Sequence, residues 1–405
     1  MEVDKIDRDH DLDASQELSL KEFWCSVLKF WGYTVDDEYL LKLLEVDKQE
    51  DIDAKKSSFF GGWGSSNGDA NNEEGEQQKS DPFTKYNLDK DESEKLFWNL
   101  LNKESPDSFI LNFIRARKWN IQKSLSMFVR SINWRLNDMY CLAIIKGGEA
   151  EAVRSNKTGL IKNLEIQKAV ICGYDIKNRP IILVRPKLHF TNDQTEAELE
   201  EFAILIIEQA RLFMKDPIRA TSILFDLSDF TLSNMDYSPV KFLVSIFEAH
   251  YPECLGPLLI HQAPWIFSPI WNIVKTWLDP VVVSKVQFTY NAKDLSKSIN
   301  MDQIPDYLGG ECKLDFDNIT LPDGSADTLL ADQKTRDEIL QERQGLIQRF
   351  IELTVKWIET DDAAVSKEIF QMRIELFKEL SENYSKLDPY TRSRSVYDIN
   401  GTLKI

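Results

Sequence analysis

Residues 254–274 are the stretch of this 405-residue chain that most limits its possible folds. They carry no charged side chain over 21 residues, which is long enough for a helix to cross a bilayer. However, Pro257, Pro264 and Pro269 interrupt the stretch, and polar side chains at positions 261, 262 and 272 break it further. We therefore expect a buried strand followed by an unusually apolar helix in a globular protein, and not a membrane span.

Short apolar runs alternate with helical patterns through the middle of the chain. The runs read as strands, and they cover residues 168–172, 181–184, 222–227, 257–261 and 282–288. The first two flank a turn over 175–180 and are expected to pair antiparallel, whereas helical patterns over 195–214 and 239–250 separate the later ones. This alternation predicts an α/β fold with a largely parallel sheet covered by helices.

Helical patterns flank this α/β body on both sides. The first begins near Ser19, a candidate N-cap, and the last two, over 331–359 and 364–384, are expected to form an antiparallel hairpin. The composition predicts these parts: an N-terminal helical extension over 1–54, a disordered linker over 55–80, a helical unit over 81–150, the α/β body over 151–314, the helical hairpin over 315–390 and a tail over 391–405. The linker carries Phe59, Phe60 and Trp63 beside glycines; a loop without a role and a contact with a membrane or partner both remain open.

The charge distribution limits the partners. The formal net charge is −18, and residues 1–105 hold 26 acidic against 13 basic side chains, so the rest of the chain is close to neutral. Nucleic acid is excluded as the main partner because it requires a basic face, and tight constitutive binding to an anionic membrane is disfavoured. The five scattered cysteines include no CxxC pair, and the acidic start precedes no apolar segment. Both features indicate free thiols in the cytoplasm.

No catalytic signature is present in the sequence. There is no GxSxG, Walker A, GxGxxG or HExxH motif, and the four histidines have no ligand spacing. The acidic run from Asp7 to Asp13 resembles a calcium loop, but Leu12 occupies the position where such a loop requires glycine. We therefore expect no enzyme, no metal site and no cofactor other than a bound ligand.

The most unusual feature of the sequence is instead an excess of apolar side chains over residues 264–279. A helix over residues 269–278 would be apolar almost all round and would have to be buried on both sides. It fits either a core helix or a mobile lid over an apolar cavity, and its tryptophans favour the membrane interface that a lid would meet. The side chains concerned are Trp265, Phe267, Ile270, Trp271, Val274 and Trp277.

Several short motifs in a fixed order resemble the CRAL-TRIO lipid-binding family. Over residues 108–312 they are Phe113–Trp119 with Trp134-Arg135, Gly173-Tyr174-Asp175 with Arg179-Pro180, Phe225-Asp226-Leu227, Tyr251-Pro252-Glu253, Ala263-Pro264-Trp265 with Leu278-Asp279-Pro280 and Ser284-Lys285, and Tyr307–Gly310. Within the family, the chain is most similar to the fungal phosphatidylinositol transfer proteins. The ending, Tyr384–Asp398, resembles a non-classical fungal branch.

The resemblance implies a helical N-terminal unit on an α/β lipid-binding domain, with a cavity closed by a gate helix over residues 264–279. Ile223 and Phe225 would line the apolar pocket together with the gate side chains. The residues implied to bind the headgroup are Arg117, Lys118, Asp175, Glu253 and Lys285. Cations would bind the phosphate and carboxylates the ring hydroxyls, with Glu253 and Lys285 acting as a pair. A purely structural ion-pair role for Arg117 and Glu253 remains the alternative.

Two positions bear on which lipid is carried. Val282 stands where a phosphatidylinositol binder often has threonine, and Thr221 and Ile223 stand where a phosphatidylcholine binder has serine and threonine. Since Ile223 cannot bond a phosphate, we expect phosphatidylinositol transfer without phosphatidylcholine transfer. The carrier would meet endosomal, endoplasmic reticulum or lipid-droplet membranes transiently and present its lipid to lipid kinases. The rival readings are a sterol or polyisoprenoid carrier and a protein–protein adaptor.

Overall fold

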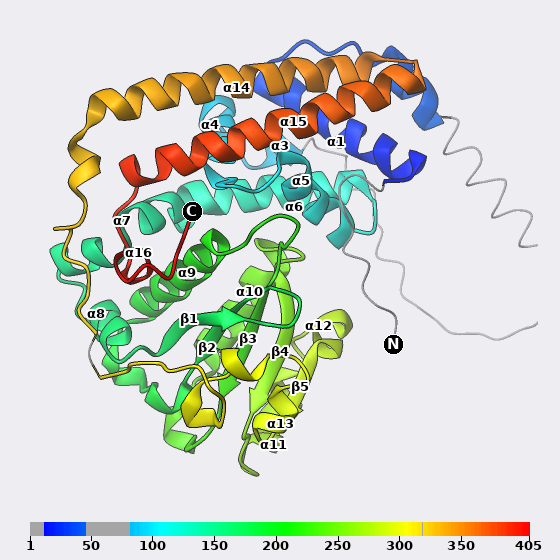
Figure 1. The fold of residues 1–405 in the computed structure, drawn as a ribbon. Helices are drawn as coiled ribbons and strands as arrows, with labels where there is room; N and C mark the ends of the chain where they lie inside the picture. Colours follow the sequence, from blue (N-terminus) through cyan, green and yellow to red (C-terminus); the bar gives the residue numbers. More distant parts are fainter. Residues whose placement is uncertain (1–11, 46–81, 318) are drawn as a thin grey trace, which may run out of the picture. The chain divides into compact units, whose positions relative to one another are not determined.

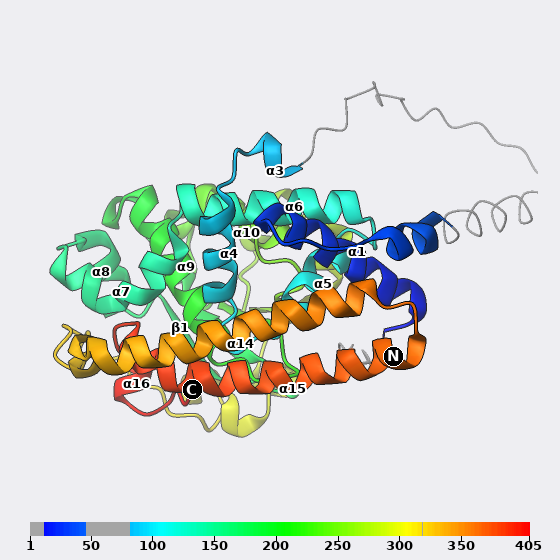
Figure 2. The same cartoon turned by 90° about the horizontal axis from the view of Figure 1, so that it is seen from above.

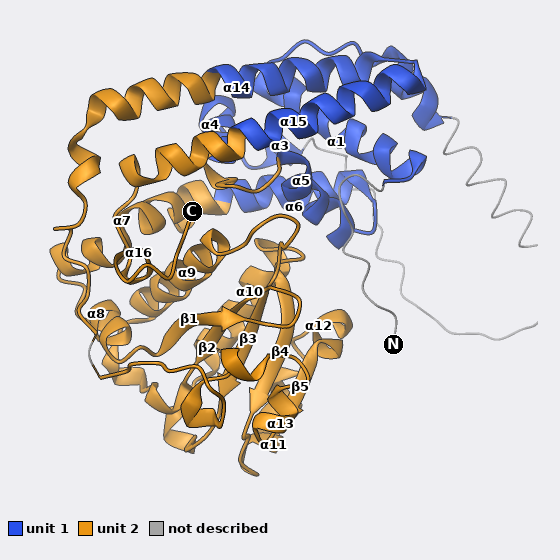
Figure 3. Cartoon of the chain, viewed as in Figure 1, with its two compact units in different colours: residues 1–98, 106–133, 345–379 blue, residues 99–105, 134–344, 380–405 orange. Residues whose placement is uncertain are grey.

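The computed structural model (Figure 1) describes residues 12–45, 82–317 and 319–405. The chain forms two compact units (Figure 3). Unit 1 comprises residues 1–98, 106–133 and 345–379, and unit 2 comprises residues 99–105, 134–344 and 380–405. The aromatic residues Phe59, Phe60 and Trp63 of the predicted linker lie outside the described residues, so their role stays a prediction.

Unit 1 is helical around an aromatic core. Its elements are α1 (Ala14–Trp31), a helical stretch over 38–45, α3 (Pro82–Lys85), most of α4 (Lys90–Leu100), α5 (Pro106–Ala116) and α6 (Ile121–Asn133). Residues 345–379, which include the turn of a long helical hairpin, also belong to it. Phe97 lies at the centre of the core, with its ring edge-on to those of Trp24, Phe109 and Phe128. Edge-to-face ring pairs stabilise a core by more than the burial of their apolar surface alone.

The first helix begins earlier than the sequence predicts. Asp13 is its N-cap, since the Asp13 carboxylate accepts from the Gln16 backbone N–H while the Gln16 side chain accepts from the Asp13 N–H. The proposed cap at Ser19 is therefore wrong. The reciprocal bonds of this capping box satisfy two N–H groups that have no partner within the helix, and the acidic run that looked like a calcium loop ends in this cap.

The predicted hairpin is present as α14 (Gln333–Glu359) and α15 (Ala363–Leu387), which Figures 1 and 2 show side by side. In the part that belongs to unit 1, Arg373 of α15 is fully buried. Its Nη2 lies 2.5 Å from Oδ1 of Asp107, which also accepts from Nε1 of Trp24. The guanidinium lies 4.4 Å from the ring centre of Trp357 and 4.8 Å from that of Phe350. This aromatic cage and the single carboxylate replace the water that the cation has lost.

Unit 2 contains one five-stranded sheet in the order β1-β2-β3-β4-β5. The strands are β1 (Ala169–Tyr174), β2 (Pro180–Val184), β3 (Thr221–Asp226), β4 (Leu255–His261) and β5 (Val286–Thr289). β1 is antiparallel to β2, and each of the later strands is parallel to the one before it. The predicted α/β class and the antiparallel first pair are confirmed.

The fifth strand starts later than predicted, because residues 280–284 form a helix, α12 (Pro280–Ser284). The Asp279 side chain accepts from the Val281 N–H, and Pro280 occupies the first helical position. Both residues favour a helix start at these positions. This local signal outweighs the preference of the following valines for a strand, so the prediction of a strand over 282–288 is wrong at its beginning.

Helices cover the two faces of the sheet unequally. The helices concerned are α7 (Cys141–Arg154), α8 (Thr158–Glu165), α9 (Glu196–Leu212), α10 (Tyr237–Ala249), α11 (Phe267–Val274) and α13 (Ala292–Leu295). A π-helical turn over Trp134–Asp138 precedes α7. One face, which we call the closed face, presents Leu183, Leu224 and Leu259, and all three are fully buried. Leu295 and the segment 299–308 pack against it. Ligand entry would require the other face.

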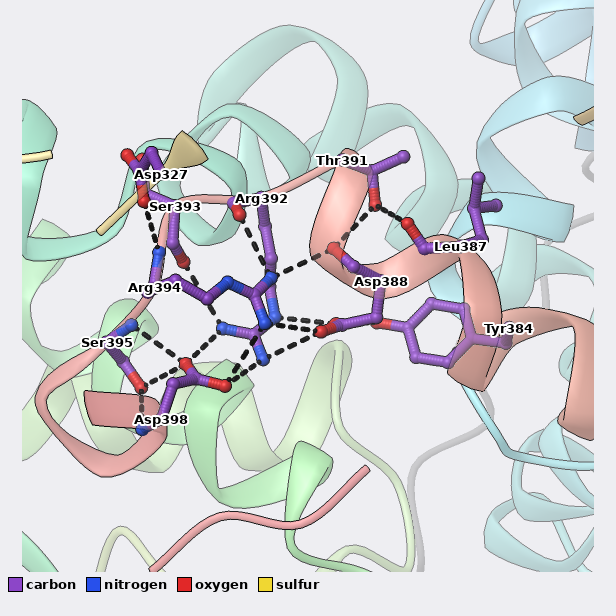
Figure 4. A network of polar contacts seen from close by, with 10 residues as sticks. All are labelled: Asp327, Tyr384, Leu387, Asp388, Thr391, Arg392, Ser393, Arg394, Ser395 and Asp398. Atoms are coloured by element: carbon purple, nitrogen blue, oxygen red, sulfur yellow. Dashed lines mark hydrogen bonds and ion pairs between the residues drawn. The ribbon is translucent and has the colours of Figure 1, made fainter. Parts of the chain in front are cut away.

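The chain after α15 is held by a group of four charges, of which Asp388 and Arg392 are buried (Figure 4). Asp388 and Asp398 lie between Arg392 and Arg394, with Arg392 Nε 2.6 Å from Asp388 Oδ1 and Arg392 Nη1 2.7 Å from Asp398 Oδ2. Arg394 Nη1 lies 2.9 Å from Asp388 Oδ2. The Tyr384 hydroxyl also donates to Asp388. The motif at 384–398 that resembles a fungal branch therefore forms one self-neutralising cluster.

The same segment reaches the edge of the sheet. The Ile171 N–H of β1 donates to the Tyr397 hydroxyl oxygen over 2.7 Å, although 226 positions separate the two residues. Tyr397 is buried beside Phe213, and its short helix, α16 (Val396–Ile399), starts at Ser395. Since an edge strand carries unpaired backbone groups, this contact gives β1 a partner within the chain.

Candidate functional site

The turn between β1 and β2 is organised by Asp175, one of the predicted headgroup residues. Its carboxylate accepts from the backbone N–H groups of Lys177 and Arg179, from Arg179 Nε at 2.7 Å and from the Ser222 hydroxyl at 2.6 Å. Asp175 is buried. All of these bonds are made within the chain, so in this structure Asp175 acts through the residues that it positions.

Arg179 is a site residue that the sequence analysis missed. Its side chain lies flat against β4, where a Cβ on Gly256 would come within 3.2 Å of Arg179 Cδ and 3.0 Å of the Thr221 carbonyl oxygen. Only glycine leaves this approach open. Arg179 Nε is paired with Asp175 Oδ2 over 2.7 Å. The signal in the sequence was a carboxylate four residues before an arginine.

Glu253 lies in the turn that leads into β4. It is solvent-exposed, and its backbone adopts a left-handed conformation with φ of 59°. A side chain other than glycine or asparagine costs about 1 to 2 kcal/mol in this conformation. Strain of this kind often marks positions where the surrounding structure presents a side chain for function.

A buried network anchors Tyr251, two residues before Glu253. The Tyr251 hydroxyl donates to Glu208 Oε1 over 2.7 Å, and Arg135 Nη1 lies 2.8 Å from the same oxygen. The Arg135 guanidinium lies 4.3 Å from the ring centre of Tyr251. Burial alone would raise the pKa of Glu208, but Arg211 and Arg135 lower it to about 2. Two motifs far apart in sequence, Trp134-Arg135 and Tyr251-Pro252-Glu253, thus meet at one charged centre.

Lys285 immediately precedes β5. Its Nζ donates to the Leu255 carbonyl oxygen over 2.8 Å, and the side chain is half-buried. Among the described residues, no ion pair joins Lys285 to Glu253. β2 to β5 are parallel, so the residues before these strands share the amino edge of the sheet. The structure therefore brings three predicted headgroup residues, Asp175, Glu253 and Lys285, to one edge together with Arg179.

The other two predicted headgroup residues belong to unit 1. Arg117 and Lys118 follow α5 in a tight turn, in which the Trp119 N–H donates to the Ile114 carbonyl oxygen. Arg117 is half-buried, with Nη1 donating to the Ala116 carbonyl oxygen, and Lys118 is exposed with φ of 51°. Both cations are accessible, and their assignment to a headgroup stays a prediction.

The second face of the sheet is only partly covered. The register places Ile182, Ile223, Phe225, Leu258 and Ile260 on it. At one side Ile182 belongs to the core formed with α9, and at the other Ile260 packs with α11. Between them, Phe225 and Leu258 remain partly exposed although they lie on central strands. We call Ile223, Phe225 and Leu258 the apolar floor, and Ile223 and Phe225 were predicted to line the pocket.

The helix within residues 264–279 is shorter than the gate helix that the resemblance implies. Only Phe267–Val274 are helical, as α11, and turns follow up to Asp279. Ile270 is buried against Phe230 and Ile260, whereas Trp265 is 84% exposed and Ile273 is 44% exposed. A helix so apolar is unstable against water unless a partner covers its outer side. Phe267, Trp271 and Val274 are partly buried beside Ile270.

α10 lies on the same side of the sheet and is also incompletely buried. Phe242, Leu243 and Phe247 are half-exposed while they pack against the core that includes Ile182. This contribution was missed, although apolar residues fill most of positions 240–247 in the sequence. The apolar floor, α10 and α11 together expose more apolar surface than isolated surface residues require.

The start of α10 is tied to a buried titratable cluster. Its N-cap, Asp236, lies 3.3 Å from Nε2 of His189, and Nδ1 of His189 lies 3.3 Å from Nζ of Lys168. Burial, and then the charge of Lys168, lowers the pKa of His189, while Asp236 and Asp193 oppose this shift. The pKa of Lys168 is lowered to about 8, mainly by burial.

This cluster predicts a loss of stability in acid. With its pKa depressed in the fold, His189 binds fewer protons there than in the unfolded chain, so the free energy of unfolding falls as the pH drops below about 6.5. The melting temperature of the wild type should decrease more between pH 7.5 and pH 5.5 than that of His189→Gln, which cannot be protonated. Equal decreases in both proteins would contradict the assignment.

A separate small cavity of unit 2 lies away from this region. It has a volume of about 30 Å³ and is lined by Lys103, Arg211, Arg219 and Tyr384 among others. This volume is of the order of one or two water molecules, so the cavity cannot hold acyl chains. In the described part of the chain, no helix is long and apolar enough to cross a membrane, and no group of acidic, histidine and cysteine side chains is arranged to hold a metal ion.

Comparison with known proteins adds a family match and a relative that aligns over nearly the full length. Residues 164–310 match the model described as CRAL/TRIO domain, and residues 73–130 match the one described as CRAL/TRIO, N-terminal domain. The chain is 46% identical over 424 residues to phosphatidylinositol transfer protein CSR1 of Eremothecium gossypii, covering 97% of each chain. A CRAL-TRIO domain-containing protein of Schizosaccharomyces pombe is 38% identical over 310 residues, which are 76% of this chain and 68% of that protein. The solved structure of Sfh5 aligns with a TM-score of 0.43 at 16% identity, over 53% of this chain and 75% of that one.

Proposed function

This chain belongs to the CRAL/TRIO family of lipid-binding and transfer proteins, and from that premise we propose that it is a non-enzymatic carrier of phosphatidylinositol. The observation that carries the proposal is the combination of two surfaces in unit 2. An apolar floor between α10 and α11 fits acyl chains, and a charged amino edge of the same sheet fits a polar headgroup.

The amino edge has the chemistry that an inositol phosphate requires. Lys285 and Arg179 supply cations for a phosphate, and Glu253 supplies a carboxylate that accepts from ring hydroxyls. Glu253 is exposed, so it is available to a ligand without first breaking an internal bond. Asp175, which is fully used within the chain, supports Arg179. The name of the 46% identical relative supports the same ligand.

The apolar floor supports a diacyl lipid. Two acyl chains hold on the order of 30 methylene groups, and burying each one contributes about 0.8 kcal/mol. A carrier must therefore offer the chains a surface as apolar as the interior of the bilayer. Phe225 and Leu258 of the floor, together with the partly exposed side chains of α10 and α11, provide such a surface; Ile223 is buried beneath it. A sterol or polyisoprenoid would use the floor but not the charged edge, which is why we favour the inositol lipid.

The carrier is proposed to work in the cytoplasm. It would exchange lipid at endosomal, endoplasmic reticulum or lipid-droplet membranes and present it to lipid kinases. Mass spectrometry of lipids that co-purify with the full chain tests the ligand directly. Phosphatidylinositol as the main species is expected, whereas a sterol or polyisoprenoid would overturn the headgroup assignment, and a lipid-free protein would favour the adaptor.

Phosphatidylcholine is not expected to be transferred. Ile223 lies on the apolar floor and offers no hydrogen bond, and the Thr221 hydroxyl already donates to the Pro180 carbonyl oxygen over 2.8 Å. A choline lipid would therefore leave its phosphate unsatisfied at this strand, at a cost of about 1 to 3 kcal/mol. Vesicle assays with the two labelled lipids should give transfer of phosphatidylinositol only, and comparable rates for both would refute the reading of this strand.

A further inference from the structure

The three tryptophans of residues 264–279 have different surroundings. Trp265 is almost fully exposed and needs no movement to meet a membrane. Trp271 lies edge-on to Phe288 of β5, with 5.6 Å between ring centres. Trp277 instead contacts α10, on the other side of the apolar floor. Replacing Trp277 would therefore break a contact with α10, which replacing either of the other two tryptophans would not do.

Two side chains of α10 hold Trp277. The Tyr237 ring lies edge-on to the Trp277 ring, with 5.6 Å between centres and an angle of 76°. Lys241, one helical turn later, places its Nζ 5.1 Å from the centre of the Trp277 ring. Both arrangements are attractive, the first between ring edge and face and the second between cation and ring.

The α10 side of this contact is anchored. The N-cap Asp236 is held by His189, and Asn234 Nδ2 donates to the carbonyl oxygens of Lys187 and His189. The Trp277 side is less constrained, since residues 275–278 lie in turns between α11 and α12, with Lys275 and Thr276 exposed. If the two separate, it is residues 275–278 that move and α10 that stays.

We propose that Trp277, clamped by Tyr237 and Lys241, is a latch that sets the rate at which lipid enters and leaves the apolar floor. The inference rests on the proposed function and adds the residues that control its rate. Opening breaks both contacts with Trp277, while the contact of Trp271 with β5 is retained. The latch is a positioning device, because none of its three residues is assigned to the headgroup.

Lipid exchange kinetics test the latch. Lys241→Met removes the cation from an exposed position without disturbing the core, and it should speed exchange of labelled phosphatidylinositol between protein and vesicles about threefold, with Trp277→Ala giving about tenfold. Uptake and release should accelerate equally, so the equilibrium occupancy of the protein stays unchanged. Lys241→Arg keeps a cation over the ring and should exchange lipid at the wild-type rate. Lys275→Met, which removes a neighbouring exposed cation, should leave the rate unchanged.

Hydrogen exchange separates the latch from the proposed function. In lipid-free Trp277→Ala, the amides of residues 275–278 should exchange faster than in the wild type, while those of the closed face should not change. If this holds but the wild type transfers no phosphatidylinositol, the proposed function is wrong and the latch stands. If the wild type transfers the lipid and both variants match its rate, or if amide exchange is unaltered, the latch is wrong.

Discussion

Replacing Glu253 with glycine is expected to abolish transfer of phosphatidylinositol without destabilising the chain. The carboxylate is lost, and a charge-assisted bond of this kind contributes about 1.5 to 3 kcal/mol, so transfer should fall more than about tenfold. The backbone, with φ of 59°, suits glycine, and relief of strain offsets the greater entropy of the unfolded chain. A vesicle transfer assay paired with thermal unfolding measures both effects.

Asp229→Gly is the matched control. Asp229 is also an exposed acid with a left-handed backbone, φ of 60°, but it follows β3 at the opposite edge of the sheet and forms an ion pair with Lys187. It should melt like Glu253→Gly and transfer lipid like the wild type. Lys285→Ala should repeat the loss of transfer. Normal transfer by both Glu253→Gly and Lys285→Ala would refute the amino-edge site.

Removing the carboxylate of Asp107 is expected to have the largest effect on stability. Asp107→Ala leaves the fully buried guanidinium of Arg373 without its counter-ion and also strands the indole N–H of Trp24. Breaking a buried ion pair in this way costs about 3 to 5 kcal/mol. Urea denaturation should show this loss in the free energy of unfolding.

The hairpin itself supplies the controls for that experiment. Arg349→Met removes a guanidinium from the surface pair with Glu379, whose partners are about half exposed, and should cost no more than about 0.5 kcal/mol. Combining Arg373→Met with Asp107→Asn removes both charges while keeping an acceptor for Trp24, and should recover most of the stability. If Asp107→Ala is no more destabilising than Arg349→Met, the cage does not depend on its ion pair.

The sheet could be predicted because its signals are local and agree with one another. Apolar runs such as 181–184 and 222–227 are short and separated by helical periodicity, which is typical of buried parallel strands. The hairpin was equally clear. The errors arose where a cap of one or two residues decided the outcome, at Asp13 and at Asp279-Pro280, since composition over a window conceals such signals.

The sequence offered candidate residues for the site but not their arrangement. Motif order pointed to Glu253 and Lys285, and their role stays a prediction. The sequence could not show that Lys285 bonds a backbone carbonyl or that Asp175 bonds Arg179 and Ser222. Likewise, the apolar character of residues 264–279 left two alternatives open, a core helix buried on both sides and a mobile lid. The structure instead exposes Trp265 and Ile273, because a surface that waits for a lipid or membrane has the composition of a core.

The contact between Tyr397 and Ile171 has a consequence for synthesis. Edge strand β1 leaves the ribosome 226 residues before the tyrosine that caps it, a delay of roughly 10 to 45 s at ordinary translation speeds. During this time the nascent sheet has an open edge, on which a chaperone or a second chain can pair. Loss of the last residues, including Tyr397, would therefore appear in cells as aggregation of the nascent chain before any defect in lipid traffic.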